Sequence, residues 1–339
     1  MKKLGAAIHG AGWVSGEHVR SYLRNPHVEM VAISSRKRKS AQALADRFGL
    51  DCAIYTNYDD LVADPRVDVI SICTPNYLHP QETIKAAQAG KHLLIEKPVA
   101  LNLADMRAMQ AAVHQAKIKT VVSFVLHWNP LFEIIKQLLE KKAIGKIFFA
   151  RVDYWHGIGP WYKEWEWVRF RDKGGTSFGS AGCHAVDAMR YFLGKEALEV
   201  SAFETGPAAG HEYSPTTVAV VNFAGGLVGQ LSSSLNIVGP YQFNIDLLGD
   251  KGTIRDNKLY SKALMPGQKG FTEIPTILPD SGDVTHHPFD GEIDHLIDCI
   301  LKDKESHVNL DDAAKTHELI FAIDESAANG GKPVKLPLG

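Results

Sequence analysis

A regular alternation of short apolar runs with helical segments constrains the fold of this chain more than any other feature. Apolar runs at 4–10, 28–35, 67–75, 92–98 and 119–125 alternate with helix-like segments, and a shorter run lies at 52–56. Continuous apolar strands separated by helices are typical of a parallel sheet covered on both faces. We therefore predict an α/β domain with a parallel sheet over residues 1–124.

The pattern changes after about residue 125. Strand-like segments joined by short turns follow, at 200–205, 217–224, 227–236, 242–249 and 252–260, with helical segments at 180–193, 291–302 and 312–329. Short turns between consecutive strands indicate an open antiparallel sheet with one covered face. Because 339 residues are too many for one core, we predict a second domain at 125–339. Its class is α+β, with a large open, mainly antiparallel sheet.

Composition argues against several classes of function. The formal net charge is -2 and no basic block stands out, so we expect no nucleic-acid partner and no anionic membrane surface. No apolar run reaches about 18 residues, so we expect no membrane span. Cys52, Cys73, Cys183 and Cys299 are widely spaced without a CxxC pair, which is typical of a reducing compartment. We expect a cytoplasmic protein.

The segment HGAGWVSGEH follows the first apolar run and begins a helical segment. It places Gly10, Gly12 and Ser15 at the glycine positions of the G-x-G-x-x-G dinucleotide motif. Glycine permits the tight turn and lets backbone N–H groups approach a pyrophosphate, and serine is small enough to keep the helix close to the strand. Because the motif stands first in a strand–helix–strand pattern, we predict a dinucleotide-binding Rossmann domain.

The end of the second predicted strand bears on the choice of coenzyme. An NAD site carries Asp or Glu there, which binds the ribose 2′-hydroxyl, whereas this chain reads SSRKRKS from Ser34 onward. Neither serine repels a phosphate, and the basic residues that follow offer positive charge where a 2′-phosphate would lie. We favour NADP, with NAD as the alternative, and assign to the coenzyme Ser35, Arg36 and Arg38. A solvated basic surface is the other interpretation.

Further motifs resemble one family. They are EKP at 96–98, TPNYLH at 74–79, AIGKI at 143–147, LLGDKGTI at 247–254, GEIDHLIDCI at 291–300 and SAANGGKPVKLP at 326–337. Their order and spacing resemble the glucose–fructose oxidoreductase, inositol dehydrogenase and rhizopine-catabolism family (Gfo/Idh/MocA), over nearly the whole chain. The resemblance implies hydride transfer between a nicotinamide coenzyme and a carbohydrate-like alcohol or aldehyde. It also implies a homodimer or homotetramer formed through the open sheet.

The resemblance assigns roles to individual residues. It implies that Glu96 and Lys97 lie at the end of the fifth strand, and that Trp13 and Val14 touch the coenzyme diphosphate. The residues expected on the nicotinamide side are Thr74, Pro75, Asn76 and His79. Pro98 would hold the turn of the lysine, and a cis peptide bond before it is one possibility.

The catalytic helix of the family usually reads Asp-x-Gly-x-His-x-x-Asp. Gly182, His184 and Asp187 match this pattern, whereas Ser180 replaces the first aspartate. Loss of that carboxylate removes charge support from the histidine. We therefore expect a weaker base at His184 and proton handling shifted toward Lys97. Asp187 lies on the same helical face and could compensate in part or hold a sugar hydroxyl.

Lys97 and His184 are the candidate catalytic residues. The hydroxyl proton of a secondary alcohol must leave as hydride departs, and a histidine base titrates near neutral pH. A lysine ammonium stabilises the developing alkoxide and can relay the proton. The small residues at 179–182 are expected to clear room for sugar and nicotinamide beside His184. The alternative is a histidine packed at the start of a helix.

Aromatic residues concentrate in YWHGIGPWYKEWEWVRF, residues 154–170. Rings can stack on sugar faces while their polar groups bind hydroxyls. The residues assigned to the substrate are His127, Tyr154, His156, Tyr162, Trp165, Ser180 and Asp187, with Trp167 and Arg169 as further candidates. For each ring, packing in the core or at an interface is the alternative.

The tract HHPFDGEIDH at 286–295 crowds histidines and acids as a metal site would. A helix entrance explains it equally well, with Asp290 as the cap and Glu292 in the first turn. Neither an HExxH motif nor a cysteine supports a metal, so we expect none. His286 or His287 could reach the substrate instead.

Two other functions fit the same motifs. In the first, a tightly held coenzyme oxidises a glycoside transiently to a ketone, which acidifies the adjacent C–H and permits cleavage or epimerisation before re-reduction. The second is a regulator that binds the dinucleotide without chemistry. The presence of both Lys97 and His184 argues against the regulator.

Overall fold

The computed structural model describes residues 3–279 and 287–339, which form two compact units. The first unit comprises residues up to 125 together with 288–314, and the second comprises 126–287 with 315–339. The predicted domains, 1–124 and 125–339, place the first break at nearly the same residue. The prediction placed residues 288–314 in the second domain, whereas in the structure they belong to the first unit.

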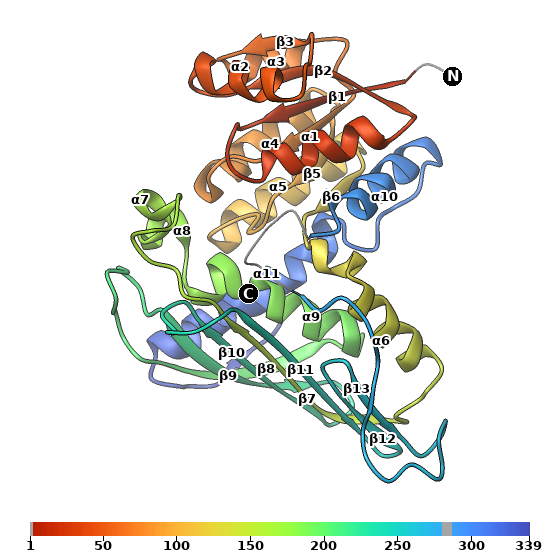
Figure 1. Ribbon diagram of the computed structural model, residues 1–339. Helices are drawn as coiled ribbons and strands as arrows, with labels where there is room; N and C mark the ends of the chain where they lie inside the picture. Colours follow the sequence, from red (N-terminus) through yellow and green to blue (C-terminus); the bar gives the residue numbers. More distant parts are fainter. Residues whose placement is uncertain (1–2, 280–286) are drawn as a thin grey trace. The chain divides into compact units, whose positions relative to one another are not determined.

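The first unit contains a six-stranded sheet of order β3-β2-β1-β4-β5-β6 (Figure 1). Every pair in it is parallel. Its strands are β1 (Leu4–His9), β2 (Val28–Ser34), β3 (Ala53–Tyr55), β4 (Val69–Ile72), β5 (His92–Ile95) and β6 (Thr120–Val122). Its helices are α1 (Ser15–Arg24), α2 (Arg38–Arg47), α3 (Tyr58–Ala63), η1 (Asn76–Leu78), α4 (His79–Gln88), α5 (Leu103–Ala116) and α10 (Phe289–Leu301). The predicted parallel Rossmann sheet is confirmed.

Local sequence explains where these elements lie. β4 is buried along its whole length, as expected for an apolar strand with helices on both faces. Helix α1 packs beside α10, and α4 packs beside α5. Asn57 and Asn102 cap α3 and α5 by accepting backbone N–H groups. Gly49 and Gly90 follow α2 and α4 with φ angles of 62° and 71°, a conformation that glycine adopts readily after a helix.

The second unit contains a nine-stranded sheet of order β14-β13-β12-β11-β7-β10-β9-β8-β15. Its strands are β7 (Ile147–Trp155), β8 (Ala197–Glu204), β9 (Thr216–Phe223), β10 (Leu227–Ser234), β11 (Gln242–Gly249), β12 (Gly252–Arg255), β13 (Lys258–Ser261), β14 (Thr272–Glu273) and β15 (Val334–Lys335). Its helices are η2 (Val125–Trp128), α6 (Pro130–Glu140), α7 (Trp165–Val168), α8 (Arg171–Gly174), η3 (Phe178–Gly182), α9 (Cys183–Leu193) and most of α11 (Leu310–Ala328).

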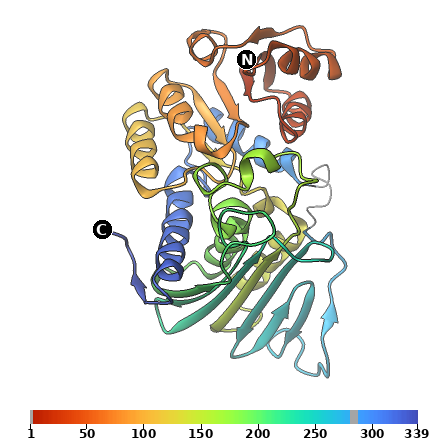
Figure 2. The same cartoon turned by 90° about the vertical axis from the view of Figure 1, so that its left-hand side faces the viewer.

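The sheet of the second unit is mostly antiparallel, as predicted, with one exception. Strands β8 with β9, β9 with β10, and β11 with β12 form antiparallel pairs. Strands β10 and β11 are consecutive in sequence, but β7 lies between them. It runs parallel to β10 and antiparallel to β11. Figure 2 shows these long strands side by side, in green to cyan.

One face of this sheet is covered and the other carries exposed apolar side chains. Helix α9 contacts β7 and β10, and α6 contacts α9 (Figure 1). Burial alternates strictly from Thr217 to Phe223 along β9, as expected for a sheet with one covered face. The exposed apolar residues on β8, β9 and β10 include Phe203, Val218, Val220 and Val228. None of the described helices has the length and apolar character needed to cross a membrane.

Candidate active site

The glycine turn between β1 and α1 fits a dinucleotide pyrophosphate. Gly10 has a φ of +100°, and a Cβ there would lie 2.5 Å from the Cys73 carbonyl oxygen, so only glycine fits. Gly12 is exposed, and a Cβ there would meet only that carbonyl, at 3.8 Å. Ser15 begins α1 and donates a hydrogen bond to the Gly12 carbonyl at 2.6 Å. The turn therefore leaves the N-terminus of α1 open to an anion, the arrangement that binds phosphate in such domains.

Serines and basic residues occupy the end of β2. Ser34 is buried and ends the strand, and Ser35 is half-buried. Arg36, Lys37 and Arg38 are all exposed. The Arg38 guanidinium donates a hydrogen bond to the carbonyl of Ile54, the middle residue of the neighbouring strand β3, at 3.2 Å. The residues at 34–38 include no carboxylate.

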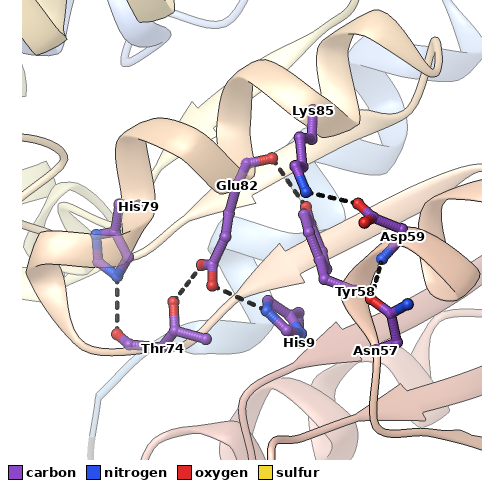
Figure 3. Close-up of polar contacts among 8 residues, drawn as sticks. All are labelled: His9, Asn57, Tyr58, Asp59, Thr74, His79, Glu82 and Lys85. Carbon is purple, nitrogen blue, oxygen red and sulfur yellow. Dashed lines mark hydrogen bonds and ion pairs between the residues drawn. The ribbon is translucent and has the colours of Figure 1, made fainter.

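A polar network connects the ends of β1 and β4 through Glu82 of α4 (Figure 3). One carboxylate oxygen of Glu82 lies 3.0 Å from His9 Nε2, and the other accepts a hydrogen bond from the Thr74 hydroxyl. The Tyr58 ring stacks on His9 with centroids 4.1 Å apart, and its hydroxyl donates to the Glu82 carbonyl. Glu82, His9 and Tyr58 were not among the residues predicted from the sequence. The only local signal was the position of His9 directly before the glycine turn.

His79 lies where the resemblance implied a residue on the nicotinamide side, but its side chain is fully buried. Its Nε2 atom lies 2.8 Å from the Thr74 carbonyl oxygen, and its Nδ1 atom lies 2.8 Å from the Pro98 carbonyl oxygen. Both ring nitrogens therefore contact the chain's own backbone. This geometry favours a role in holding two loops over direct contact with a coenzyme.

Glu96 and Lys97 follow directly after β5, as expected. Burial would raise the pKa of Glu96, but the His18 hydrogen bond at 3.1 Å and the charges of His18, Lys97 and His79 outweigh it and lower that pKa. The Lys97 backbone N–H donates to the Glu96 carboxylate at 3.3 Å. The Lys97–Pro98 peptide bond is cis. Lys97 therefore directly follows the buried carboxylate of Glu96, whose lowered pKa favours the charged form.

Helix α10 does not begin as the sequence analysis expected. Its first residue is Phe289, so Asp290 lies in the first turn and does not cap the helix. Asp290 instead accepts hydrogen bonds from Ser21 and Arg24 of α1. His286 lies outside the described residues. No cluster of three or more His, Cys, Asp and Glu side chains suited to a metal occurs among residues 3–279 and 287–339.

His184 is the second residue of α9, directly after the π-helical turn η3, and is buried. Single-turn π-helices are frequent at functional sites. A Cβ on Gly182 would lie 2.3 Å from Ser233 Oγ of β10. Ser233 therefore fills the space beside this glycine, which favours a packing role for Gly182. Ser180, which stands at the family's aspartate position, is also buried.

Asp187 and His127 form a buried pair in the second unit. His127 Nε2 lies 2.8 Å from one carboxylate oxygen of Asp187, and Thr316 Oγ1 donates to the other at 3.3 Å. The Tyr191 ring stacks on His127 with centroids 3.9 Å apart. Because both carboxylate oxygens already have partners, the geometry favours a structural role for Asp187 over direct binding of a sugar hydroxyl.

The predicted aromatic residues separate into two groups. Tyr154 stacks on His184 at 6.2 Å, and Tyr241 lies edge-on to Tyr154 and His156 at 5.4 and 5.6 Å. Trp165 is buried and lies edge-on to His211 at 4.9 Å, which favours the packing alternative for this ring. Tyr162 lies edge-on to the exposed Trp161 at 6.0 Å, and Trp161 lies 6.4 Å from His156, so these two rings belong to the group around Tyr154. The sequence analysis missed Tyr241 because it lies outside the aromatic segment.

Two family models match this chain. A model described as an oxidoreductase family with an NAD-binding Rossmann fold matches residues 4–124. A model of the GFO/IDH/MocA C-terminal domain matches residues 132–255.

Individual proteins of known name are similar over most of the chain. The myo-inositol 2-dehydrogenase of Thermotoga maritima is 27% identical and covers 78% of both chains. The scyllo-inositol 2-dehydrogenase (NAD(+)) of Bacillus subtilis is 25% identical and covers 97% of this chain and 95% of its own. The WlbA dehydrogenase of Bordetella pertussis, solved with NADH and UDP-GlcNAcA, superposes with a TM-score of 0.85 over 100% of both chains at 23% identity.

Proposed function

Because this chain belongs to the Gfo/Idh/MocA family of oxidoreductases, we propose that it is a dehydrogenase of a sugar, cyclitol or sugar derivative. It transfers hydride between a secondary alcohol carbon and a nicotinamide coenzyme. The observation that carries the proposal is the glycine turn at Gly10 and Gly12, which leaves the N-terminus of α1 open. In the same sheet, Lys97 lies just after the end of β5. The inositol dehydrogenases among the relatives support the class of substrate.

Lys97 and His184 divide the proton chemistry in this proposal. A nicotinamide coenzyme would supply the acceptor or donor of the hydride. His184 removes the hydroxyl proton during oxidation and returns it during reduction, the general base and acid role that suits an imidazole. The Lys97 ammonium stabilises the negative charge that develops on the substrate oxygen. Tyr154, which stacks on His184, orients that ring.

The coenzyme in this proposal is NADP. Support comes from the end of β2, where Ser34 and Ser35 precede the exposed Arg36, Lys37 and Arg38 and no carboxylate is present at 34–38. A guanidinium binds a phosphate with charge-assisted hydrogen bonds, whereas an NAD site uses a carboxylate on the ribose 2′-hydroxyl. We therefore expect kcat/KM to be higher with NADP than with NAD.

The experiment is a panel of sugars, cyclitols and glycosides assayed with NADP and NAD separately, following the reduction of the nicotinamide. We expect wild-type activity on at least one polyol or sugar. The substitutions Lys97→Ala and His184→Ala should each lower kcat by about 10²-fold or more, the usual contribution of a general acid or base. Lys85→Ala and His27→Ala, which remove exposed side chains, serve as matched controls with wild-type rates.

Specific outcomes contradict each part of the proposal. Near-normal rates in both Lys97→Ala and His184→Ala would remove the catalytic assignment. A higher kcat/KM with NAD would overturn the coenzyme assignment. Cleavage of a glycoside without net reduction of the coenzyme would replace simple dehydrogenation with a redox-assisted glycosidase.

A further inference from the structure

We propose that His79 is a positioning residue whose two ring nitrogens contact the carbonyl oxygens of Thr74 and Pro98, and that these contacts fix the backbone that carries Lys97. The proposal rests on the function proposed above, in which the Lys97 ammonium acts on the substrate oxygen. His79 itself does not touch substrate or coenzyme. It acts through the two loops that follow β4 and β5.

The two contacts join segments that are distant in sequence. Thr74 lies in the loop after β4, and Pro98 lies directly after Lys97 in the loop after β5. Each carbonyl oxygen lies 2.8 Å from one nitrogen of the same imidazole ring. His79 is the first residue of α4 and is fully buried, so the ring lies between these loops without competition from water. One side chain therefore fixes the separation of the two loops.

Both ring nitrogens of His79 face carbonyl oxygens of the chain's own backbone, each at 2.8 Å. A carbonyl oxygen only accepts hydrogen bonds, so an N–H of the ring is the donor group that these carbonyls can bind. The two contacts hold the ring in one orientation between the loops.

A second side chain of α4 contacts the loop after β4 as well. Glu82, one turn along α4, binds the Thr74 hydroxyl while His79 binds the Thr74 carbonyl (Figure 3). Two side chains of α4 thus fasten the same residue of the β4 loop.

A double-mutant cycle tests whether His79 acts through Lys97. His79→Gln keeps a polar side chain but cannot reach both carbonyls as a rigid ring does. We expect it to lower kcat by about 10- to 100-fold, the range seen when a reacting group is misplaced by about 1 Å, with little change in the substrate KM. In a Lys97→Ala background the same substitution should change the single-turnover rate by less than about twofold, because coupled residues are non-additive.

Lys85→Ala is the matched control, because Lys85 lies on the same helix and pairs with Asp59 at the surface. It should leave kcat at the wild-type value. A purely structural role would lower kcat equally in both backgrounds, and that result would overturn the proposal. Wild-type kcat in a folded His79→Gln protein would overturn it as well.

A second measurement does not depend on activity. In protein labelled with ¹⁵N-histidine, the ring signals that disappear in His79→Gln identify His79. We expect a ring N–H of His79 that exchanges slowly with solvent, because the buried ring contacts two carbonyl oxygens. A ring N–H that exchanges rapidly would contradict this geometry. If the wild-type enzyme oxidises nothing in the panel, the proposed function fails, whereas this spectrum still tests the contacts of His79.

Discussion

Glu96 and Glu292 show that partners, rather than burial alone, decide the charge of a buried acid in the first unit. Glu96 has His18 as a hydrogen-bond partner, and its pKa lies below the usual value despite the opposing effect of burial. Glu292 is fully buried and accepts one hydrogen bond from Ser123, and its other carboxylate oxygen has no hydrogen-bond partner among the described residues. Burial, reinforced by the charge of Glu96, raises its pKa well above 4.5.

This difference predicts a pH-dependent gain in stability for Glu292→Gln. An acid whose pKa is raised by folding stabilises the folded state only when protonated, so its cost is absent below the usual pKa of 4.5 and grows as the pH rises above it. We expect Glu292→Gln to increase the free energy of unfolding at pH 7 by about 1 kcal/mol or more. The gain should vanish towards about pH 4.

Urea denaturation from acid to neutral pH measures the effect of Glu292→Gln. The exposed Glu29 gives the matched control, because Glu29→Gln should change stability little at any pH. A Glu292→Gln protein that is less stable than wild type at neutral pH would contradict the prediction.

At the scale of elements, the turn η3 depends on close packing against β10 and on small polar side chains. Gly182 leaves space that Ser233 occupies, and Ser233 donates a hydrogen bond to the Ser177 carbonyl at 3.0 Å. Thr176 Oγ1 accepts from the Gly179 N–H at 2.9 Å and donates to Asp324 of α11 at 3.0 Å. The conformation that leads into His184 is thus held by contacts to two other elements.

Gly182→Ala should therefore destabilise the protein, and Ser233→Gly should restore part of the loss. The added methyl would lie 2.3 Å from Ser233 Oγ and 2.9 Å from the Ser177 carbonyl oxygen. We expect a cost of about 1–3 kcal/mol for Gly182→Ala, as for other overpacked sites. The double variant should be more stable than Gly182→Ala alone, measured by urea denaturation. Equal stability of the two would show that the serine is not the obstacle.

At the scale of the whole molecule, one face of the nine-stranded sheet carries exposed apolar side chains. Phe203, Val218, Val220 and Val228 are 65%, 41%, 50% and 40% exposed, and they lie on the adjacent strands β8, β9 and β10. A contiguous apolar patch of this kind is typical of a protein interface. We propose that a second copy of the chain covers it, which forms a homodimer or homotetramer.

Val220→Glu tests this proposal, because a charge in the middle of an apolar interface is costly to bury. We expect light scattering after size exclusion to show a smaller assembly for Val220→Glu than for wild type. The melting temperature measured on the dissociated protein should indicate a folded chain. Val238 is fully exposed in a loop outside the patch, so Val238→Glu should leave the assembly unchanged. An unchanged mass for Val220→Glu would rule out this face.

Local patterns in the sequence predicted the architecture and the glycine turn of the first unit. Strand and helix periodicities predicted the parallel sheet, and the glycine motif predicted the turn at Gly10, which has a φ of +100°. Both signals are read from residues close together in the chain, so they are visible without a structure. The position of Lys97 after β5 agrees with what the family resemblance implied.

Only the tertiary structure decided which distant residues meet. It inserted β7 between β10 and β11, returned α10 to the first unit, and set Ser233 against Gly182. It also joined Thr74 and Pro98 through one buried histidine. Such contacts leave no periodic signal, because packing selects them for shape and hydrogen bonding between segments that the chain order separates.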